Sequence, residues 1–101
     1  MSKINKLPSS VLFACTMNTV RSAMAEGILK KISGNHVYVD SVGIRNGEQD
    51  GYTIEVMKEI DVDLSKHRSK TFAALDDTSF DLIISLSPEA HHAALELTRW
   101  M

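Results

Sequence analysis

Short apolar runs alternate with helix-like segments along this chain, and this alternation restricts the possible folds more than any other feature. Three runs rich in apolar and β-branched residues are typical of strands, and the first and third suit burial on both faces of a sheet. They cover residues 11–14, 36–42 and 80–86. Helical spacing follows each run, over residues 22–32, 53–60, 69–75 and 87–99. The pattern predicts an α/β protein with three layers, α/β/α, around a parallel sheet.

The termini of two predicted helices carry recognisable signals. Thr53 is a candidate N-cap for the helix at 53–60. Ser87 and Pro88 suit the start of the last helix as its cap and first residue, and Glu89 places an acidic group in the first turn.

Length and composition favour one ordinary intracellular domain. The 101 residues carry a formal net charge of −2, so no basic surplus points to nucleic acid or to an anionic membrane. Cys15 is the only cysteine, which excludes an internal disulfide and fits a reducing compartment. The first residues lack the pattern of a signal peptide, and no segment has the length of a membrane span. We expect a single cytoplasmic domain over residues 1–101.

A Cys-x5-Arg loop joins the first predicted strand to the first predicted helix. Cys15 lies at the carboxyl end of the strand, where parallel sheets place their sites, and Arg21 stands where the helix begins. Five intervening residues can curl so that backbone N–H groups and the helix N-terminus cradle a tetrahedral dianion. Arginine can bind two of its oxygens, and the same positive field stabilises a thiolate facing the phosphorus. A lone cysteine at a strand end can also be an inert, buried side chain.

The loop residues have distinct expected roles. Asn18 tolerates the left-handed conformation that such a loop needs, and Ser22 is placed to donate a hydrogen bond to the sulfur. Cys15 and Arg21 are the predicted catalytic residues. The predicted phosphate-binding residues are Thr16, Met17, Asn18, Thr19, Val20, Arg21 and Ser22.

The segment VLFACTMNTVRSAMAEG resembles the active-site segment of the low-molecular-weight protein tyrosine phosphatases, whose usual form is V-x-F-V-C-x-G-N-x-C-R-S-P-M-A-E. Stretches at 40–43, 64–70 and 80–84 are similar to later segments of that family, so the likeness covers nearly the whole chain. The resemblance implies Cys15 as nucleophile, Arg21 as phosphate clamp, and no metal or organic cofactor. It also implies that a hydrogen-bond network shapes the loop, formed by Asn18, Ser22, Ser41 and His67.

Several positions depart from the family pattern. Val20 replaces a second cysteine that protects the nucleophile, so Cys15 is expected to overoxidise more readily. Met17 and Ala23 replace the usual glycine and proline. The loop after Ser41 is shorter than usual and lacks the aromatic residue that walls a phosphotyrosine ring.

The sequence ends before the family's fourth strand and the Asp-Pro loop that carries its general acid. General acid catalysis contributes roughly 10²–10⁴-fold, so we expect slow turnover of ordinary esters and less impairment with activated ones. The strand at 80–86 would then be an open apolar edge, which predicts self-association through that strand.

These observations favour a phosphomonoester hydrolase of the protein tyrosine phosphatase type that works through a phospho-cysteine. Its expected ligands are a phosphorylated protein or small phosphomonoester, and inorganic phosphate or a similar oxyanion. One alternative is a phosphate-binding module without turnover. A second is arsenate reduction, which the single cysteine disfavours, and a third is an α/β fragment with an inert thiol.

Overall fold

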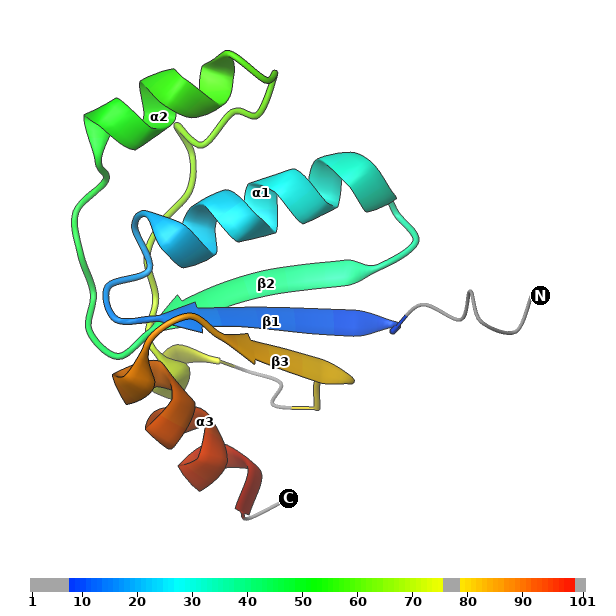
Figure 1. Ribbon diagram of the computed structural model, residues 1–101, viewed down its shortest axis with the longest axis vertical. Helices are drawn as coiled ribbons and strands as arrows, with labels where there is room; N and C mark the ends of the chain where they lie inside the picture. Colours follow the sequence, from blue (N-terminus) through cyan, green and yellow to red (C-terminus); the bar gives the residue numbers. More distant parts are fainter. Residues whose placement is uncertain (1–7, 76–78, 100–101) are drawn as a thin grey trace.

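The computed structural model describes residues 8–75 and 79–99, and in them one parallel sheet carries helices on both faces (Figure 1). Its strands are β1 (Ser10–Cys15), β2 (Tyr38–Gly43) and β3 (Leu82–Ser85), in the order β2-β1-β3. Both β2 and β3 pair in parallel with β1. The α/β/α fold expected from the alternation is confirmed.

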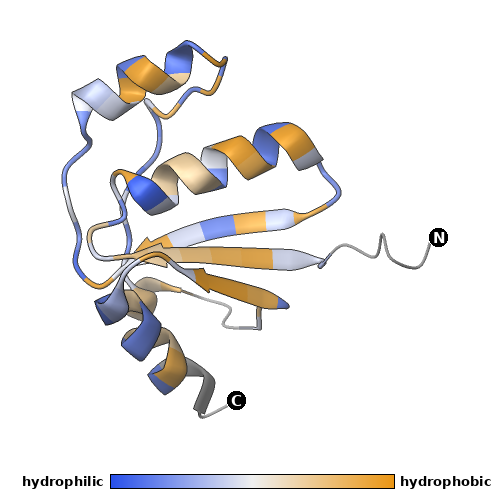
Figure 2. Cartoon of the chain, viewed as in Figure 1, coloured by the Kyte–Doolittle hydropathy of each residue, from blue (hydrophilic) through white to orange (hydrophobic). Residues whose placement is uncertain are grey.

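The central strand β1 separates two apolar clusters because successive side chains of a strand point to opposite faces. Val11 and Phe13 face the helix α1 (Arg21–Ser33), where Ala25 and Leu29 pack against them. The alternate residues face the helix α3 (Pro88–Arg99). That second cluster contains Leu12, Ala14, Val42 and Ala90. Figure 2 shows apolar residues gathered on β1 and β3, whereas apolar and polar residues are interspersed along the helices.

The helix α2 (Gly51–Lys58) packs on the outer side of α1 rather than on the sheet (Figure 1). Met57 is its buried anchor, in a cluster with Ala23 of α1 and with Val62 and Leu64 of the following loop. The segment after this loop therefore returns across α1 toward the carboxyl end of the sheet, where a short 3-10 helix, η2 (Phe72–Ala74), follows.

One of the two predicted helix caps is confirmed. The Ala90 N–H donates to Ser87 Oγ at 3.1 Å, so Ser87 caps α3 as predicted. The expectation for Thr53 is wrong, because α2 already begins at Gly51. Thr53 instead lies inside the helix and donates its hydroxyl to the Asp50 carboxylate at 2.5 Å.

β3 forms one edge of the described sheet, and it is less buried than β1. Leu82 is 43% exposed, and the other three residues of β3 are partly buried. Self-association through this edge stays a prediction. Within the described ranges, no helix is both long and apolar enough to cross a membrane.

Gly43, the last residue of β2, allows the Cys-x5-Arg loop to lie directly against the end of that strand. It pairs with Cys15 in the sheet and bridges to Thr71 on its other side. A Cβ atom at Gly43 would lie 2.9 Å from backbone atoms of Thr16, Met17 and Asn18. Because these neighbours are backbone, a side chain here requires the loop itself to move.

Replacing Gly43 by alanine is therefore expected to destabilise the fold by about 1–3 kcal/mol, the usual range for overpacking. The control is Gly51→Ala, because a Cβ atom at Gly51 meets nothing within 4 Å. Urea unfolding of the two variants measures the difference. Equal stability of both variants would contradict the close approach between loop and strand.

Candidate active site

The Cys-x5-Arg loop lies at the carboxyl end of the sheet and surrounds a small cavity of about 140 Å³. The structure brings six of the predicted site residues to its wall. They are Cys15, Thr16, Met17, Thr19, Val20 and Arg21. The remaining two residues of the loop, Asn18 and Ser22, are fully buried behind it. The loop thus divides into residues that line the cavity and residues that are buried beneath it.

The sulfur of Cys15 receives two short polar contacts. Its Sγ atom lies 2.9 Å from Ser22 Oγ, and the backbone N–H of Asn18 donates to it at 3.2 Å. The side chain is 5% exposed, so water contributes little to its solvation. In a buried environment, hydrogen-bond donors directed at the sulfur stabilise a thiolate.

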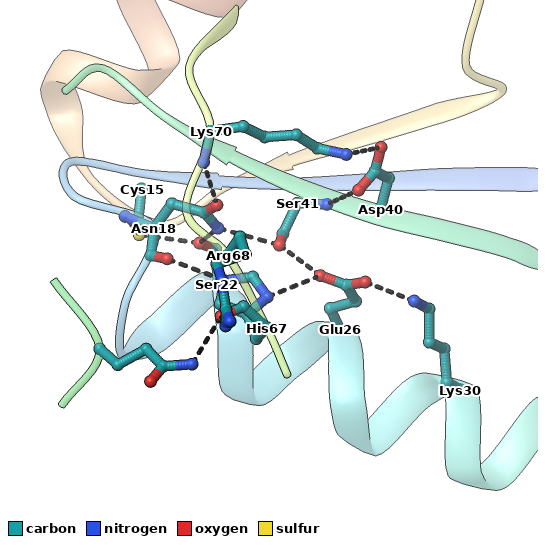
Figure 3. Close-up of polar contacts among 11 residues, drawn as sticks. Cys15, Asn18, Ser22, Glu26, Lys30, Asp40, Ser41, His67, Arg68 and Lys70 are labelled. Carbon is teal, nitrogen blue, oxygen red and sulfur yellow. Dashed lines mark hydrogen bonds and ion pairs between the residues drawn. The ribbon is translucent and has the colours of Figure 1, made fainter. Parts of the chain in front are cut away.

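Asn18 is the centre of the polar network beneath the loop (Figure 3). It has a φ of 57°, in the left-handed region that asparagine tolerates, as the sequence predicted. Its Nδ2 donates to Ser22 Oγ at 2.8 Å and to Ser41 Oγ at 2.9 Å. Its Oδ1 accepts the backbone N–H of Lys70 at 3.0 Å, and its backbone carbonyl contacts His67 Nε2 at 3.0 Å.

These contacts determine the direction of the hydrogen bonds that the Asn18 amide makes. The N–H of Lys70 can only donate, so it identifies Oδ1 of Asn18 and leaves Nδ2 to donate to both serines. Ser22 Oγ thus accepts from Asn18, and its own hydrogen is available for the Cys15 sulfur. At the other end, Ser41 donates to the Glu26 carboxylate at 2.5 Å. The network is therefore polarised to stabilise a negatively charged sulfur.

His67 and Glu26 complete the support from the side of α1. The Asn18 carbonyl can only accept, so Nε2 of His67 carries a hydrogen and the opposite ring nitrogen, Nδ1, lies 3.8 Å from Glu26 Oε1. Glu26 also pairs with Lys30 at 2.5 Å. The four predicted loop-supporting residues are thus joined directly or through Glu26. They are Asn18, Ser22, Ser41 and His67.

Sequence reasoning assigned no role to Glu26 or to Lys70 in this network. The role of Glu26 had a signal in the sequence, because Glu26 belongs to the segment after Arg21 that resembles the family motif. Lys70 had none, because it supports Asn18 through its backbone N–H, a group that almost every residue type possesses.

Arg21 lines the cavity, and its Nη1 donates to the backbone carbonyl of Leu86 at 2.7 Å. Leu86 follows β3, so the guanidinium links the loop to the corner between β3 and α3. A guanidinium has five N–H donors, and this contact uses one of them. The contact holds the Arg21 side chain in position and leaves its other guanidinium N–H groups available to an oxyanion.

Thr16, in the wall of the cavity, contacts polar side chains at the start of α3 that sequence reasoning did not assign to the site. Thr16 Oγ1 lies 3.2 Å from Ser87 Oγ and 3.5 Å from Glu89 Oε1. Arg45 pairs with the same Glu89 oxygen at 3.4 Å. In the part of the chain that the structure describes, no three His, Cys, Asp or Glu side chains form a group able to hold a metal ion.

Known proteins with similar sequences include bacterial arsenate reductases. An arsenate reductase of Staphylococcus aureus is 38% identical over 81 residues, which make up 80% of this chain and 62% of the relative. The chain therefore spans less than two thirds of the length of the curated relatives it matches.

Solved structures with the same fold include phosphatases. Wzb of Vibrio vulnificus in complex with benzylphosphonate matches with a TM-score of 0.75 and 27% identity, covering 88% of this chain and 65% of Wzb. YwlE of Bacillus subtilis, described as an arginine phosphatase in another of its structures, matches with a TM-score of 0.73 and 30% identity. That match covers 90% of this chain and 66% of YwlE.

The model of one protein family, low molecular weight phosphotyrosine protein phosphatase, matches residues 10–100. This range includes the Cys-x5-Arg loop, the three strands and all the residues that support the loop. The chain belongs to the low molecular weight phosphotyrosine protein phosphatase family.

Proposed function

We propose that this chain is a phosphomonoester hydrolase that forms a phospho-cysteine intermediate on Cys15. The observation that carries the proposal is the pair of contacts at the sulfur: the Asn18 N–H donates to it, and Ser22 Oγ, which accepts from Asn18, lies 2.9 Å away with its own hydrogen available to a thiolate. A merely packed cysteine needs no such donors. The substrate class is a phosphorylated protein or a small phosphomonoester, in a reducing compartment such as the cytoplasm.

The first chemical step is attack of the Cys15 thiolate on the phosphorus atom. A sulfur–phosphorus bond forms, and the bond from phosphorus to the leaving-group oxygen breaks. Arg21 and the backbone N–H groups of the loop bind the equatorial oxygens, where negative charge is held in the transition state. The leaving oxygen departs with its electron pair and takes up a proton if it is basic.

The second step is hydrolysis of the phospho-cysteine. A water oxygen attacks phosphorus, its protons pass to solvent or to phosphate, and the sulfur leaves as a thiolate. Ser22 donates its hydrogen to the departing sulfur, so it acts most strongly in this step. The thiolate is regenerated, and inorganic phosphate is released.

Arsenate reduction is the activity named in the curated relatives, and it requires two electrons. Cys15 is the single cysteine among these 101 residues, so they cannot supply both electrons by forming an internal disulfide. A second thiol from another molecule would have to join the reaction. Ester hydrolysis needs no such co-reactant and is the better supported activity.

p-Nitrophenyl phosphate tests the proposal most directly, because its leaving group departs without a proton. We expect a burst of p-nitrophenolate equal to about one per chain, followed by slower turnover. Cys15→Ser is expected to abolish both phases, whereas Ser65→Ala, a change at an exposed position, keeps them. Turnover that persists in Cys15→Ser, or phosphate binding without any burst in the unaltered chain, would contradict the assignment.

Ser22→Ala removes the side-chain donor to the sulfur while leaving the loop residues that face the cavity. One hydrogen bond to a charged group contributes about 1.5 kcal/mol, so we expect iodoacetamide to alkylate Cys15 roughly three- to tenfold more slowly at neutral pH. Steady-state hydrolysis is expected to fall more than the burst amplitude, because the second step depends on Ser22. Ser33→Ala, at the far end of the same helix, is the control. Equal alkylation rates in the two variants would rule out this role.

A further inference from the structure

A second and larger cavity, of about 470 Å³, opens behind the active-site loop. Its wall comes from α1, from the first part of β2 and from the segment at 63–70 that returns across α1. This volume is within the range of small-molecule sites. The charged side chains that line it include Glu26, Lys30, Asp40, Lys66, Arg68 and Lys70.

Two ion pairs in this cavity place carboxylates inward and ammonium groups outward (Figure 3). Glu26 pairs with Lys30 at 2.5 Å, and Asp40 pairs with Lys70 at 2.7 Å. Both carboxylate side chains are 12% exposed, whereas the lysine side chains are 53% and 38% exposed. A molecule that enters from solvent therefore meets the cations first.

Lys70 keeps its charge in this place. Burial lowers the pKa of its ammonium group, but the hydrogen bond to Asp40 and the charges of Asp40 and Glu26 outweigh burial. The net result is that the pKa of Lys70 is raised above its ordinary value.

The returning segment adds two more cations, Lys66 and Arg68, both exposed. The nearby Asp63 carboxylate offsets part of this positive charge, and it accepts the backbone N–H of Ser65 at 2.9 Å. Hydrogen bonds from the side chain and the backbone N–H of Ser65 lower the pKa of Asp63, and the charge of Lys66 lowers it further. The wall thus holds four lysine or arginine side chains and three carboxylates, in a chain whose overall charge is −2.

We propose that this cavity is a binding site for a small multivalent oxyanion, such as a phosphate compound or a di- or tricarboxylate. Lysine and arginine side chains provide the charge-assisted hydrogen bonds that such groups require. The buried carboxylates keep Lys30 and Lys70 in position, and Lys66 and Arg68 supply the excess positive charge.

The site shares two residues with the support of the active-site loop. Glu26 accepts the Ser41 hydrogen bond, and His67 contacts the Asn18 carbonyl, while both residues also line the second cavity. An anion that draws Lys30 away from Glu26 therefore acts on the same network that supports Cys15. Linkage requires that occupancy of either site changes the affinity of the other. Because both ligands are negative, we expect each to weaken the other.

The test measures binding by calorimetry, with pyrophosphate and citrate as separate probes. Arg21→Ala serves as the background, because it removes the clamp of the first cavity. Binding is expected to persist there and to weaken at least fivefold when Lys66→Ala and Arg68→Ala are added, as loss of two charged contacts predicts. The control pair, Lys31→Ala and Lys58→Ala, removes the same charge from positions outside this cavity and is expected to change affinity less than twofold.

The unaltered chain supplies an independent measurement, should Arg21→Ala fold poorly. Protection of Cys15 from alkylation by inorganic phosphate reports occupancy of the first cavity, once the alkylation rate with citrate alone is taken as the baseline. We expect citrate to reduce the protection that inorganic phosphate gives. The Lys66 and Arg68 substitutions are expected to remove the citrate effect while phosphate still protects.

Three outcomes would overturn the proposal. The first is that neither anion binds, and the second is that the two double variants lose affinity equally. The third is that an acidic peptide binds through Lys66 and Arg68 while the small anions do not, which would assign a peptide surface instead. Since these measurements need no turnover, their failure is distinguishable from failure of the hydrolase proposal.

Discussion

The side chain of Asn18 is the constraint on which the rest of the site depends. It is fully buried, and its amide and backbone connect the loop to α1, to β2 and to the segment at 67–70. Without the amide, the Lys70 N–H would lose its partner, and Ser22 and Ser41 would each lose a donor, at a cost of about 1–3 kcal/mol for a buried group left unpaired. The same amide decides which way the Ser22 hydroxyl points, so one side chain links stability of the fold to the reactivity of Cys15.

Local placement, rather than overall charge, explains how an acidic chain brings basic side chains to both cavities. At the loop, Arg21 lines the cavity, and the Asn18 N–H is directed at the Cys15 sulfur. In the second cavity, the Glu26 and Asp40 carboxylates are more buried than the lysine side chains with which they form ion pairs. Glu26 connects the two regions because it accepts from Ser41 on one side and from Lys30 on the other.

Elements with local signals were predictable, and elements set by distant contacts were less so. The three strands and the cap at Ser87 followed from apolar runs and from the Ser-Pro signal. The start of α2 was predicted two residues late, because Thr53 has the chemistry of a cap and uses it within the helix, toward Asp50. The packing of α2 on α1 depends on Met57, whose burial becomes evident only when the chain has folded back.

The sequence by itself determined the strand, the loop with its cysteine and arginine, and the helix that follows, because these features depend on neighbouring residues and short spacings. Only the tertiary structure decided what supports and surrounds that loop. Lys70 reaches Asn18 across 52 positions through a backbone N–H, and Glu89 reaches Thr16 across 73 positions from the start of α3. Contacts of this kind leave no local pattern, since they are made where the parallel sheet brings the ends of separate strands to one edge.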